Sequence, residues 1–379
     1  MSEYQYYEFQ AVDRPLTGEE MRELRSYSTR ARITPTSFVN EYHWGDFKGN
    51  PDAWMERYFD AYLYLANWGT HAFMLRLPSR LLDAKTAREY CGGECASTRV
   101  KSGHVILSFE SEDDNGDDLL EGDGVLSSLI SVRAELARGD RRALYLGWLL
   151  LAQVGEFDDD EVEPPVPPGL GAVSASLRSM AGFLRIDGDL LHVAAQASPP
   201  MEGAGIDHDE VQAWVGALAT DEKESLITNL LVDGGHIPIL ELHQRLLKER
   251  PAGDVRPAAA GRTVGELFRA ADARAKERGR IEAENRAREQ ARREREAAIA
   301  REKHLDSLAG REPKLWAEVE RLIVTKQPAR YDQAVKRLVD LRDLDARAKG
   351  GEFVRRIAAL REAHARKPSL LERLAKAAL

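Results

Sequence analysis

The chain has 379 residues, of which 43% are apolar and 31% are charged, a composition typical of two or three folded domains and not of a disordered chain. Residues 1–10 lack a basic region followed by an apolar run, and no stretch of about 18 uncharged apolar residues occurs, which argues against secretion and against a membrane-spanning helix. Two cysteines, Cys91 and Cys95, are too few for a disulfide framework, so we expect a cytoplasmic protein.

Residues 1–154 are predicted to form an α+β domain. Alternating aromatic and apolar residues predict extended segments, and Thr17 with Glu20 three positions later has the pattern of a capping box at a helix start. The predicted strands are residues 4–12, 33–42, 72–77 and 104–109. The predicted helices are residues 18–28, 52–67, 79–90, 126–138 and 141–153. This order favours a ferredoxin-type sandwich followed by two helices.

The next part of the sequence alternates linkers with helical periodicity. Residues 155–171 are acidic and rich in proline, which predicts a linker that is part flexible and part polyproline. Residues 172–250 predict an all-helical bundle, because apolar residues recur there at helical spacing. Its expected helices are residues 173–184, 187–197, 208–218, 222–231 and 236–248. Residues 251–261 are predicted to be a second linker.

A long charged helix is predicted over residues 262–306, followed by a helical bundle over residues 311–379. At 1.5 Å per residue the long helix would measure roughly 60 Å. Its apolar heptad positions are mostly alanine, which favours a single helix with charge pairs over a firm coiled coil. The expected pairs are Glu282 with Arg286, Glu284 with Arg288 and Glu289 with Arg293. The bundle helices are expected at residues 314–325, 330–346, 352–364 and 368–378.

Charge is divided unevenly along the chain. From residue 262 onward there are 30 basic and 20 acidic residues, whereas the whole chain carries a net charge of −9. This division is typical of a basic tail that has an anionic partner, or of one that folds back on its own acidic body. Both interpretations remain open from the sequence.

The C-terminal residues resemble a known family. The segments LWAEVE at 315–320, YDQAV at 331–335, LVDLRDL at 338–344 and HARKPSLL at 364–371 are similar to the helical C-terminal tail of bacterial SWIM zinc-finger proteins. A SWIM site also needs a C-x-C pair and a later C-x-H, because four ligands close a tetrahedral zinc site. The chain has neither motif, so the resemblance does not imply zinc-dependent nucleic-acid binding here.

One region of the predicted N-terminal domain is dense in aromatic and histidine residues. Its members could line a pocket in which a base, a sugar or a peptide stacks, with Asp46 near His43 for acid and base chemistry. Plain core is favoured over this interpretation, because Trp54, Tyr58 and Tyr62 follow helical spacing. The candidate pocket residues are Tyr42, His43, Trp44, Asp46, Trp68 and His71.

No cofactor and no metal are predicted. Cys91, Cys95 and His104 could supply three ligands, but a fourth is not evident, and the acidic loop over residues 110–123 lacks the ligand spacing of a calcium loop. Common nucleotide-binding and hydrolase motifs are absent as well. An enzyme would therefore have to use an unrecognised site in the N-terminal domain.

The most basic stretch lies on the predicted long helix. Its arginines could follow a phosphate backbone, although glutamates interrupt them and no aromatic residue is present for base stacking. These arginines are Arg286, Arg288, Arg292, Arg293 and Arg295.

Three functional hypotheses follow. The first is a non-enzymatic interaction or scaffold protein whose helical tail, residues 312–379, docks on a protein partner. The second is a nucleic-acid-associated accessory factor that uses the basic helix. The third is an enzyme centred on the aromatic region.

Overall fold

The computed structural model describes residues 4–113, 121–201, 208–233, 236–249 and 261–379. The chain divides into two compact units, Met1–Glu277 and Arg278–Leu379. The first unit contains an antiparallel sheet with helices, and the second is helical, which confirms the predicted order of an α+β part followed by a mainly helical part. Within the described residues, no helix combines the length and the apolar composition needed to cross a bilayer.

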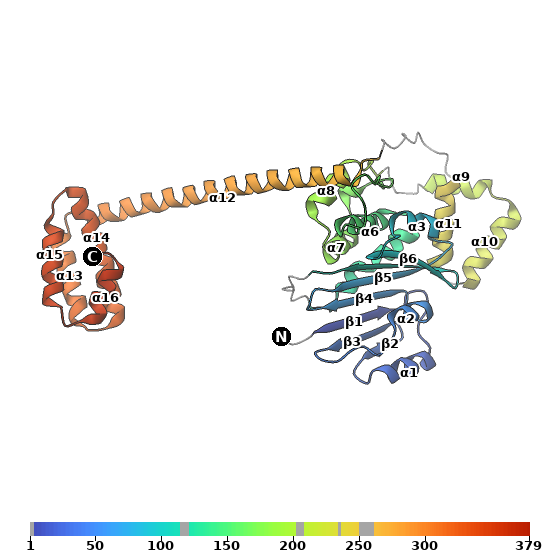
Figure 1. Cartoon of the computed structure of the whole chain (residues 1–379), viewed down its shortest axis with the longest axis horizontal. Helices are drawn as coiled ribbons and strands as arrows, with labels where there is room; N and C mark the ends of the chain where they lie inside the picture. Colours follow the sequence, from blue (N-terminus) through green and yellow to red (C-terminus); the bar gives the residue numbers. More distant parts are fainter. Residues whose placement is uncertain (1–3, 114–120, 202–207, 234–235, 250–260) are drawn as a thin grey trace. The chain divides into compact units, whose positions relative to one another are not determined.

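The sheet has seven strands in the order β2-β3-β1-β4-β5-β7-β6, and every recorded strand pair is antiparallel (Figure 1). The strands are β1 Gln5–Gln10, β2 Arg32–Thr34, β3 Ser37–Tyr42, β4 Ala61–Ala66, β5 His71–Pro78, β6 Ala96–Lys101 and β7 His104–Ser111. The ferredoxin-type arrangement is not confirmed. The sequence predicts only four strands, and it misses the strands β4 and β6 and the turn that separates β2 from β3.

The segment from residue 52 to residue 67 differs from its prediction. The sequence predicts a helix over this whole segment, but only α2, Pro51–Arg57, is helical. The chain then forms β4 in the middle of the sheet. Tyr62 and Tyr64 point to one face of the sheet while Leu63 and Leu65 point to the other, because successive strand side chains alternate. In the sequence Trp54, Tyr58 and Tyr62 match a helical spacing, but the hydrogen bonds that β1 and β5 offer on both sides favour a strand from Ala61 onward.

One face of the sheet carries an aromatic core. Phe9, Phe38 and Tyr62 of the sheet pack there against α1, Gly18–Tyr27, and against Trp54 of α2. The predicted capping box at the start of α1 is confirmed. The Glu20 backbone N–H donates to Thr17 Oγ1 at 3.2 Å, and the Thr17 N–H donates to Glu20 Oε2 at 2.8 Å. These two bonds satisfy backbone donors that the first helical turn would otherwise leave without partners.

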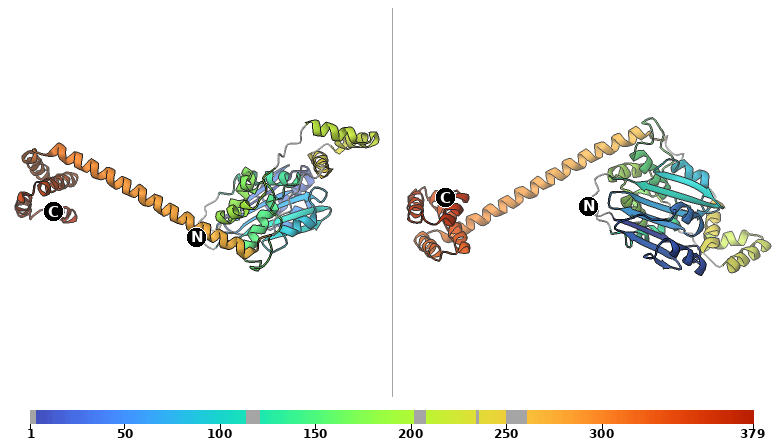
Figure 2. Two further views of the ribbon diagram at one scale, coloured as in Figure 1. Left: turned by 90° about the horizontal axis from the view of Figure 1, so that it is seen from above. Right: turned by 60° about the horizontal axis from the view of Figure 1, so that its bottom comes forward.

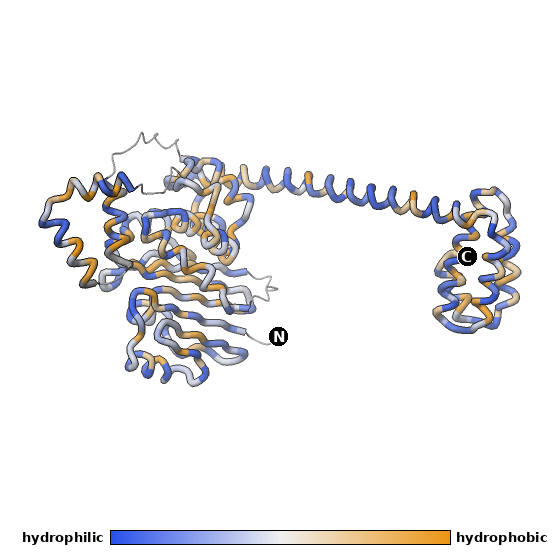
Figure 3. The backbone as a smooth tube through the Cα atoms, turned by 180° about the vertical axis from the view of Figure 1, so that it is seen from behind, coloured by the Kyte–Doolittle hydropathy of each residue, from blue (hydrophilic) through white to orange (hydrophobic). Residues whose placement is uncertain are grey.

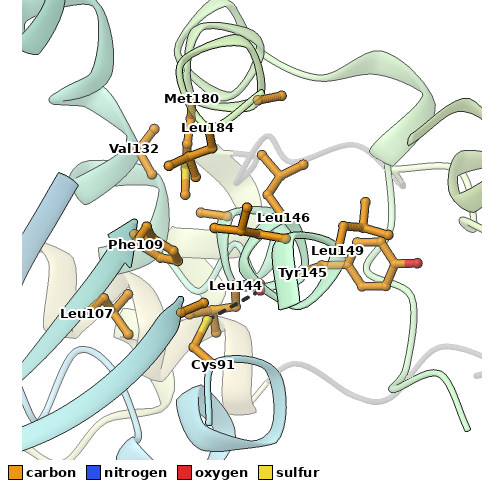
Figure 4. Packing of buried hydrophobic residues seen from close by; sticks show 14 of the residues in the cluster. Cys91, Leu107, Phe109, Val132, Leu144, Tyr145, Leu146, Leu149, Met180 and Leu184 are labelled. Carbon is orange, nitrogen blue, oxygen red and sulfur yellow. Dashed lines mark hydrogen bonds between the residues drawn. The ribbon is translucent and has the colours of Figure 1, made fainter. Parts of the chain in front are cut away.

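The other face of the sheet is covered by further helices (Figure 1, Figure 2). They are α3 Ala84–Tyr90, α4 Val125–Leu129, α5 Ser131–Ala137, α6 Arg142–Gln153, α7 Ala175–Phe183 and α8 Gly188–Gln196. In α6 every residue from Arg142 to Ala152 is buried. Figure 4 shows Leu146 of α6 near Phe109 of β7 and Met180 of α7, and Leu144 of α6 next to Cys91. The helices α7 and α8 therefore share the core of the sheet.

The proline-rich segment over residues 155–171 lies against the first unit. The Tyr90 hydroxyl donates to the Pro165 carbonyl at 2.7 Å, and the Glu163 N–H donates to the Arg262 carbonyl at 2.8 Å. The Glu163 carboxylate, whose side chain is 3% exposed, also accepts two hydrogen bonds of 2.9 Å from the Arg262 guanidinium. Because a buried carboxylate needs such partners, this pair fixes the segment beside the start of the next long helix.

Three more helices belong to the first unit: α9 His208–Ala217, α10 Thr220–Asp233 and α11 His236–Glu249. In α11, Gln244 Nε2 donates to the carbonyl oxygens of Leu81 at 2.6 Å and Ala137 at 2.7 Å. The predicted second linker and the centre of the predicted acidic loop lie largely outside the described residues.

The long helix is α12, Val264–Leu308. Its first residues, Val264 and Leu267, are buried in the core of the first unit, whereas most of its length is hydrophilic (Figure 3). The predicted pair between Glu289 and Arg293 is confirmed at 2.9 Å. The other two predicted pairs are replaced, because Glu282 and Glu284 pair with the arginines that precede them. Those arginines are Arg278 and Arg280.

The second unit has its own core. Four helices follow the end of α12: α13 Glu312–Val324, α14 Pro328–Ala348, α15 Glu352–Ala363 and α16 Pro368–Lys376. All four predicted helices are confirmed within a few residues at each end. Helix α14 packs against α13, α15 and α16, and Leu305 of α12 is buried with them. Ion pairs from Arg301 to Asp340 at 2.5 Å and to Asp343 at 2.6 Å join α12 to α14.

Candidate functional site

The six residues predicted to line a pocket lie at one end of the sheet. Tyr42 ends β3 opposite Gln5 of β1, and Gln5 is also opposite Ala66 at the end of β4. Trp68 follows in the turn between β4 and β5, and His71 begins β5. The sheet register therefore brings these residues to the same end, which the sequence spacing alone does not require.

Their side chains do not share one site. His71 is buried opposite Leu65 on the face that the helices α3 to α8 cover. Its ring stacks on Phe183 with 4.7 Å between ring centroids, and Arg185 Nη2 lies 3.1 Å from His71 Nε2. Because the guanidinium can only donate, His71 Nε2 accepts, and Nδ1–H donates to the Phe183 carbonyl at 2.8 Å. These contacts hold the His71 ring in the packed interior, away from a shared pocket.

The remaining five residues lie on the opposite face or at the surface. The Tyr42 ring meets Tyr7 edge-on at 5.8 Å, and burial raises the pKa of the Tyr42 hydroxyl. Trp44 is 68% exposed beneath the guanidinium of Arg30, and Trp68 is 46% exposed. His43 and Asp46 are also exposed. An arrangement spread over two faces and the surface offers no common enclosure for acid and base chemistry.

A buried network of charges lies at the other end of the sheet. Asp60 Oδ1 accepts from Arg76 Nε at 3.0 Å and Nη2 at 2.7 Å, while Asp60 Oδ2 accepts the N–H groups of Val12 and Asp13. Arg133 donates to Asp13 Oδ2 at 2.6 Å and to the Arg76 carbonyl at 2.7 Å. The Asp60 carboxylate and the two guanidiniums thus all have partners, as buried charges require. We interpret the network as a structural tie between β1, β5 and α5.

The two cysteines behave as structural thiols. Cys91 is buried, and its Sγ donates to the Leu144 carbonyl at 3.5 Å (Figure 4). Burial and the nearby Glu156 carboxylate raise the pKa of Cys95 to about 11, so it is protonated at neutral pH. His104 instead lies beside the Ser102 carbonyl. The part of the chain that the structure describes contains no group of three metal-binding side chains.

The five arginines predicted to contact nucleic acid all lie on α12, and all are exposed. Two of them, Arg292 and Arg293, both pair with Glu289 at 2.9 Å. The other three have no carboxylate partner among the described residues, partly because Glu282 and Glu284 pair elsewhere. These three are Arg286, Arg288 and Arg295.

A groove lies in the second unit between α13 and α15, with a volume of about 460 Å³. Helix α13 contributes Trp316, Glu320 and Val324 at intervals of four residues, which places them along one side of the helix. Helix α15 contributes a second wall of Arg356, Ala359, Leu360 and Ala363, and His364 follows directly after the helix. The groove therefore has a largely apolar lining, with one carboxylate and one guanidinium.

The walls of the groove are built differently. Trp316 is 6% exposed and packs against Phe353 at 5.8 Å, and the Arg356 guanidinium lies 4.4 Å above its ring. This cation–π contact holds the arginine against the indole. Val324, at the end of α13, is 69% exposed although it is apolar. His364 has a lowered pKa, chiefly through burial and then through the charge of Lys367.

The charges of residues 312–379, the helices that carry this groove, are unbalanced. In this segment, more basic than acidic side chains are without an ion-pair partner among the described residues. The basic ones are Lys314, Arg321, Lys326, Arg330, Lys336, Lys349, Arg355, Arg361, Arg366 and Lys367. The acidic ones are Glu312, Glu320, Asp345 and Glu362. The surface of these helices is consequently positive.

Sequence reasoning identified the tail helices but not the groove. The apolar spacing of each helix marks its buried side, whereas the groove depends on how far apart α13 and α15 lie. One signal was present in the sequence. Ala359 and Ala363 are one turn apart on α15, and such small residues on a helix leave room beside it.

Comparisons of the chain with protein families, with curated proteins and with solved structures found no match. The resemblance of the last 70 or so residues to the tail of SWIM zinc-finger proteins stays a prediction.

Proposed function

We propose that this protein is a non-enzymatic interaction protein, and that its C-terminal helices, residues 312–379, dock on another protein. The groove between α13 and α15 carries the proposal. Grooves of this kind receive amphipathic helices, whose apolar side chains enter while the polar side stays in water. The small side chains of Ala359 and Ala363 would let a partner helix approach α15 closely.

Two residues of the groove suit a binding contact. Tryptophan and arginine are enriched among the residues that dominate binding energies, and Trp316 and Arg356 are already held in place by their mutual contact. Val324 is an exposed apolar side chain, and its complete burial by a partner would contribute about 1.5 kcal/mol. The groove is thus partly organised before binding.

We infer that the partner segment is an acidic amphipathic helix. The unpaired basic side chains of the tail favour a negatively charged partner, because opposite charges accelerate encounter and orient it. Such a complex would weaken as salt rises, since exposed charges are screened over about 8 Å at physiological ionic strength.

The first experiment places a photo-crosslinking amino acid at Val324 of the full-length protein. Val354 is the matched control, because it lies in the same unit and its exposure of 67% nearly equals that of Val324, but it does not line the groove. We expect crosslinks from position 324, but not from 354, to one acidic helical segment. The same products from both positions would contradict the proposal.

The identified partner, once purified, is then titrated against two variants of the tail. Ala359→Glu places a bulky negative charge in the groove, whereas Ala358→Glu places it on the neighbouring exposed position outside the groove. We expect Ala359→Glu to weaken binding about tenfold or more, because an unfavourable charge and lost packing together cost roughly 1–3 kcal/mol. Equal affinities for the two variants would refute docking at this groove.

A second candidate function is association with nucleic acid through α12. Arg286, Arg288 and Arg295 favour it, because all three are exposed without a carboxylate partner among the described residues. Each phosphate neutralised by such a side chain adds affinity that falls with salt. The neighbouring glutamates, among them Glu289 and Glu294, reduce this attraction.

A further inference from the structure

A separate cleft lies in the first unit, where α11 meets the N-terminal end of α3 and the loop between α5 and α6. Its volume is about 260 Å³, and Leu81, Leu82 and Leu136 supply apolar lining. Gln244 of α11 is 8% exposed and donates to the carbonyl oxygens of Leu81 and Ala137. These two hydrogen bonds hold the α11 wall against the rest of the cleft.

Both carboxylates that line the cleft already accept hydrogen bonds from neighbouring residues. Asp83 accepts hydrogen bonds from the Thr86 N–H at 2.8 Å and from the Thr86 hydroxyl at 2.9 Å, which lowers the pKa of Asp83. Asp140 accepts from Arg142 Nε at 3.0 Å and from Arg142 Nη2 at 2.7 Å. Neither aspartate therefore uses an arginine that lines the cleft as its hydrogen-bond donor.

The two arginines of the cleft, Arg138 and Arg141, are exposed, and neither forms an ion pair with a carboxylate in the described part of the chain. The charge of Arg138 reaches the neighbouring helix α11. Burial lowers the pKa of His243 on this helix, and the charge of Arg138 lowers it further. His243 Nδ1 is buried without a hydrogen-bond partner among the residues that the structure describes. The cleft thus combines an apolar lining with positive charge that no carboxylate neutralises directly.

We propose that this cleft binds a small organic anion that has an apolar body. Arg138 and Arg141 would donate charge-assisted hydrogen bonds to the anionic head, and these bonds are stronger than those between neutral groups. The apolar body would lie against the leucines, as in ligand sites where a few polar groups orient a mainly apolar ligand. Because the cleft lies in the first unit, this binding is independent of docking by the tail.

The test uses two fluorescent probes that share an apolar body. Anilinonaphthalene sulfonate carries an anionic group, and N-phenylnaphthylamine is its neutral counterpart. Both are titrated into the full-length protein and into Arg138→Gln, Arg141→Gln and Arg88→Gln. Arg88 is the matched control, because it is an exposed arginine of α3 that does not line the cleft. Thermal unfolding of each variant confirms that it is folded.

We expect saturable binding of the anionic probe that weakens about tenfold in Arg138→Gln and in Arg141→Gln but not in Arg88→Gln. The affinity of the neutral probe should be the same in all four proteins, because it makes no charge-assisted bond. Three results would overturn the proposal: no saturable binding of the anionic probe, equal affinities in all variants, or an equal loss of the neutral probe.

Discussion

The contribution of an ion pair to stability depends on how deeply the pair is buried, as Asp60 shows. Its side chain is 1% exposed, and it accepts hydrogen bonds from Arg76 and from two backbone N–H groups. Asp52 also pairs with an arginine, Arg99 at 2.5 Å, but its side chain is 48% exposed. A buried charge that loses its partner has no water to replace it, whereas an exposed charge does.

We predict that Asp60→Asn lowers the free energy of unfolding by about 3 kcal/mol, because it leaves the Arg76 guanidinium buried without its counter-charge. Asp52→Asn, which removes the same charge from an exposed pair, should cost less than about 1 kcal/mol. Urea unfolding of the two variants measures both values. Similar losses in the two proteins would show that the Asp60 network is not a stabilising tie.

Helix α6 contains a residue type that disfavours helix formation. Gly147 lies in its middle, where glycine costs about 1 kcal/mol relative to alanine. The structure supplies the reason. A Cβ atom at this position would lie 2.6 Å from Cys91 Sγ and 2.7 Å from Phe109 Cε1. The glycine therefore allows the helix to lie close against β7 and the end of α3.

Gly147→Ala is accordingly predicted to destabilise the protein by about 1–3 kcal/mol, in spite of the better helix propensity of alanine. The matched control is Gly182→Ala in α7, where nothing lies within 4 Å of the added atom. That substitution should be neutral or stabilise by about 0.5–1 kcal/mol. Thermal or chemical unfolding of both variants gives the comparison, and a stabilised Gly147→Ala protein would contradict the close packing of α6.

The two units of the molecule carry net charges of opposite sign. Residues 278–379 carry a net charge of +9, and the residues before them carry −18. Many basic side chains of the second unit are nevertheless paired, as in the contacts of Arg347 with Glu302 and Asp306. Each such pair cancels one positive and one negative charge, so pairing leaves the net charge of the unit unchanged but reduces the number of basic side chains that remain to contact a partner.

This pairing leads to a prediction about nucleic acid. We expect no retarded complex in a mobility-shift titration at physiological salt, because on α12 only short, interrupted groups of arginines are unpaired. The test compares the full-length protein with Arg286→Gln/Arg288→Gln/Arg295→Gln. A control, Arg280→Gln/Arg292→Gln/Arg293→Gln, removes the same charge from arginines that pair with glutamates. A complex lost only in the first triple variant, and steeply weakened by salt, would instead support the second candidate function.

The helical second half of the chain was predictable from local signals. Apolar residues on one side of each tail helix predict their existence, and the structure confirms all four. Strand β4 was not predictable in this way, because Trp54, Tyr58 and Tyr62 fit a helical spacing that the sheet overrides. A short apolar segment can satisfy either period, and its neighbours in space decide between them.

The candidate sites show the same limit. Tyr42, Trp68 and His71 were grouped by their type and nearness in sequence, and the sheet does bring them to one end, but on different faces. The groove beside Trp316 and the cleft beside Arg138 join residues from separate helices. No sequence spacing encodes such distances.

By itself, the sequence determined the uneven charge, the long charged helix and the order of an α+β part followed by helices. These features depend on composition and on contacts between residues a few positions apart. Only the tertiary structure decided the strand order, the glycine contact in α6, and which arginines remain without a carboxylate partner among the described residues. The reason is physical: burial and pairing depend on residues that are distant in the chain and become neighbours only when it folds.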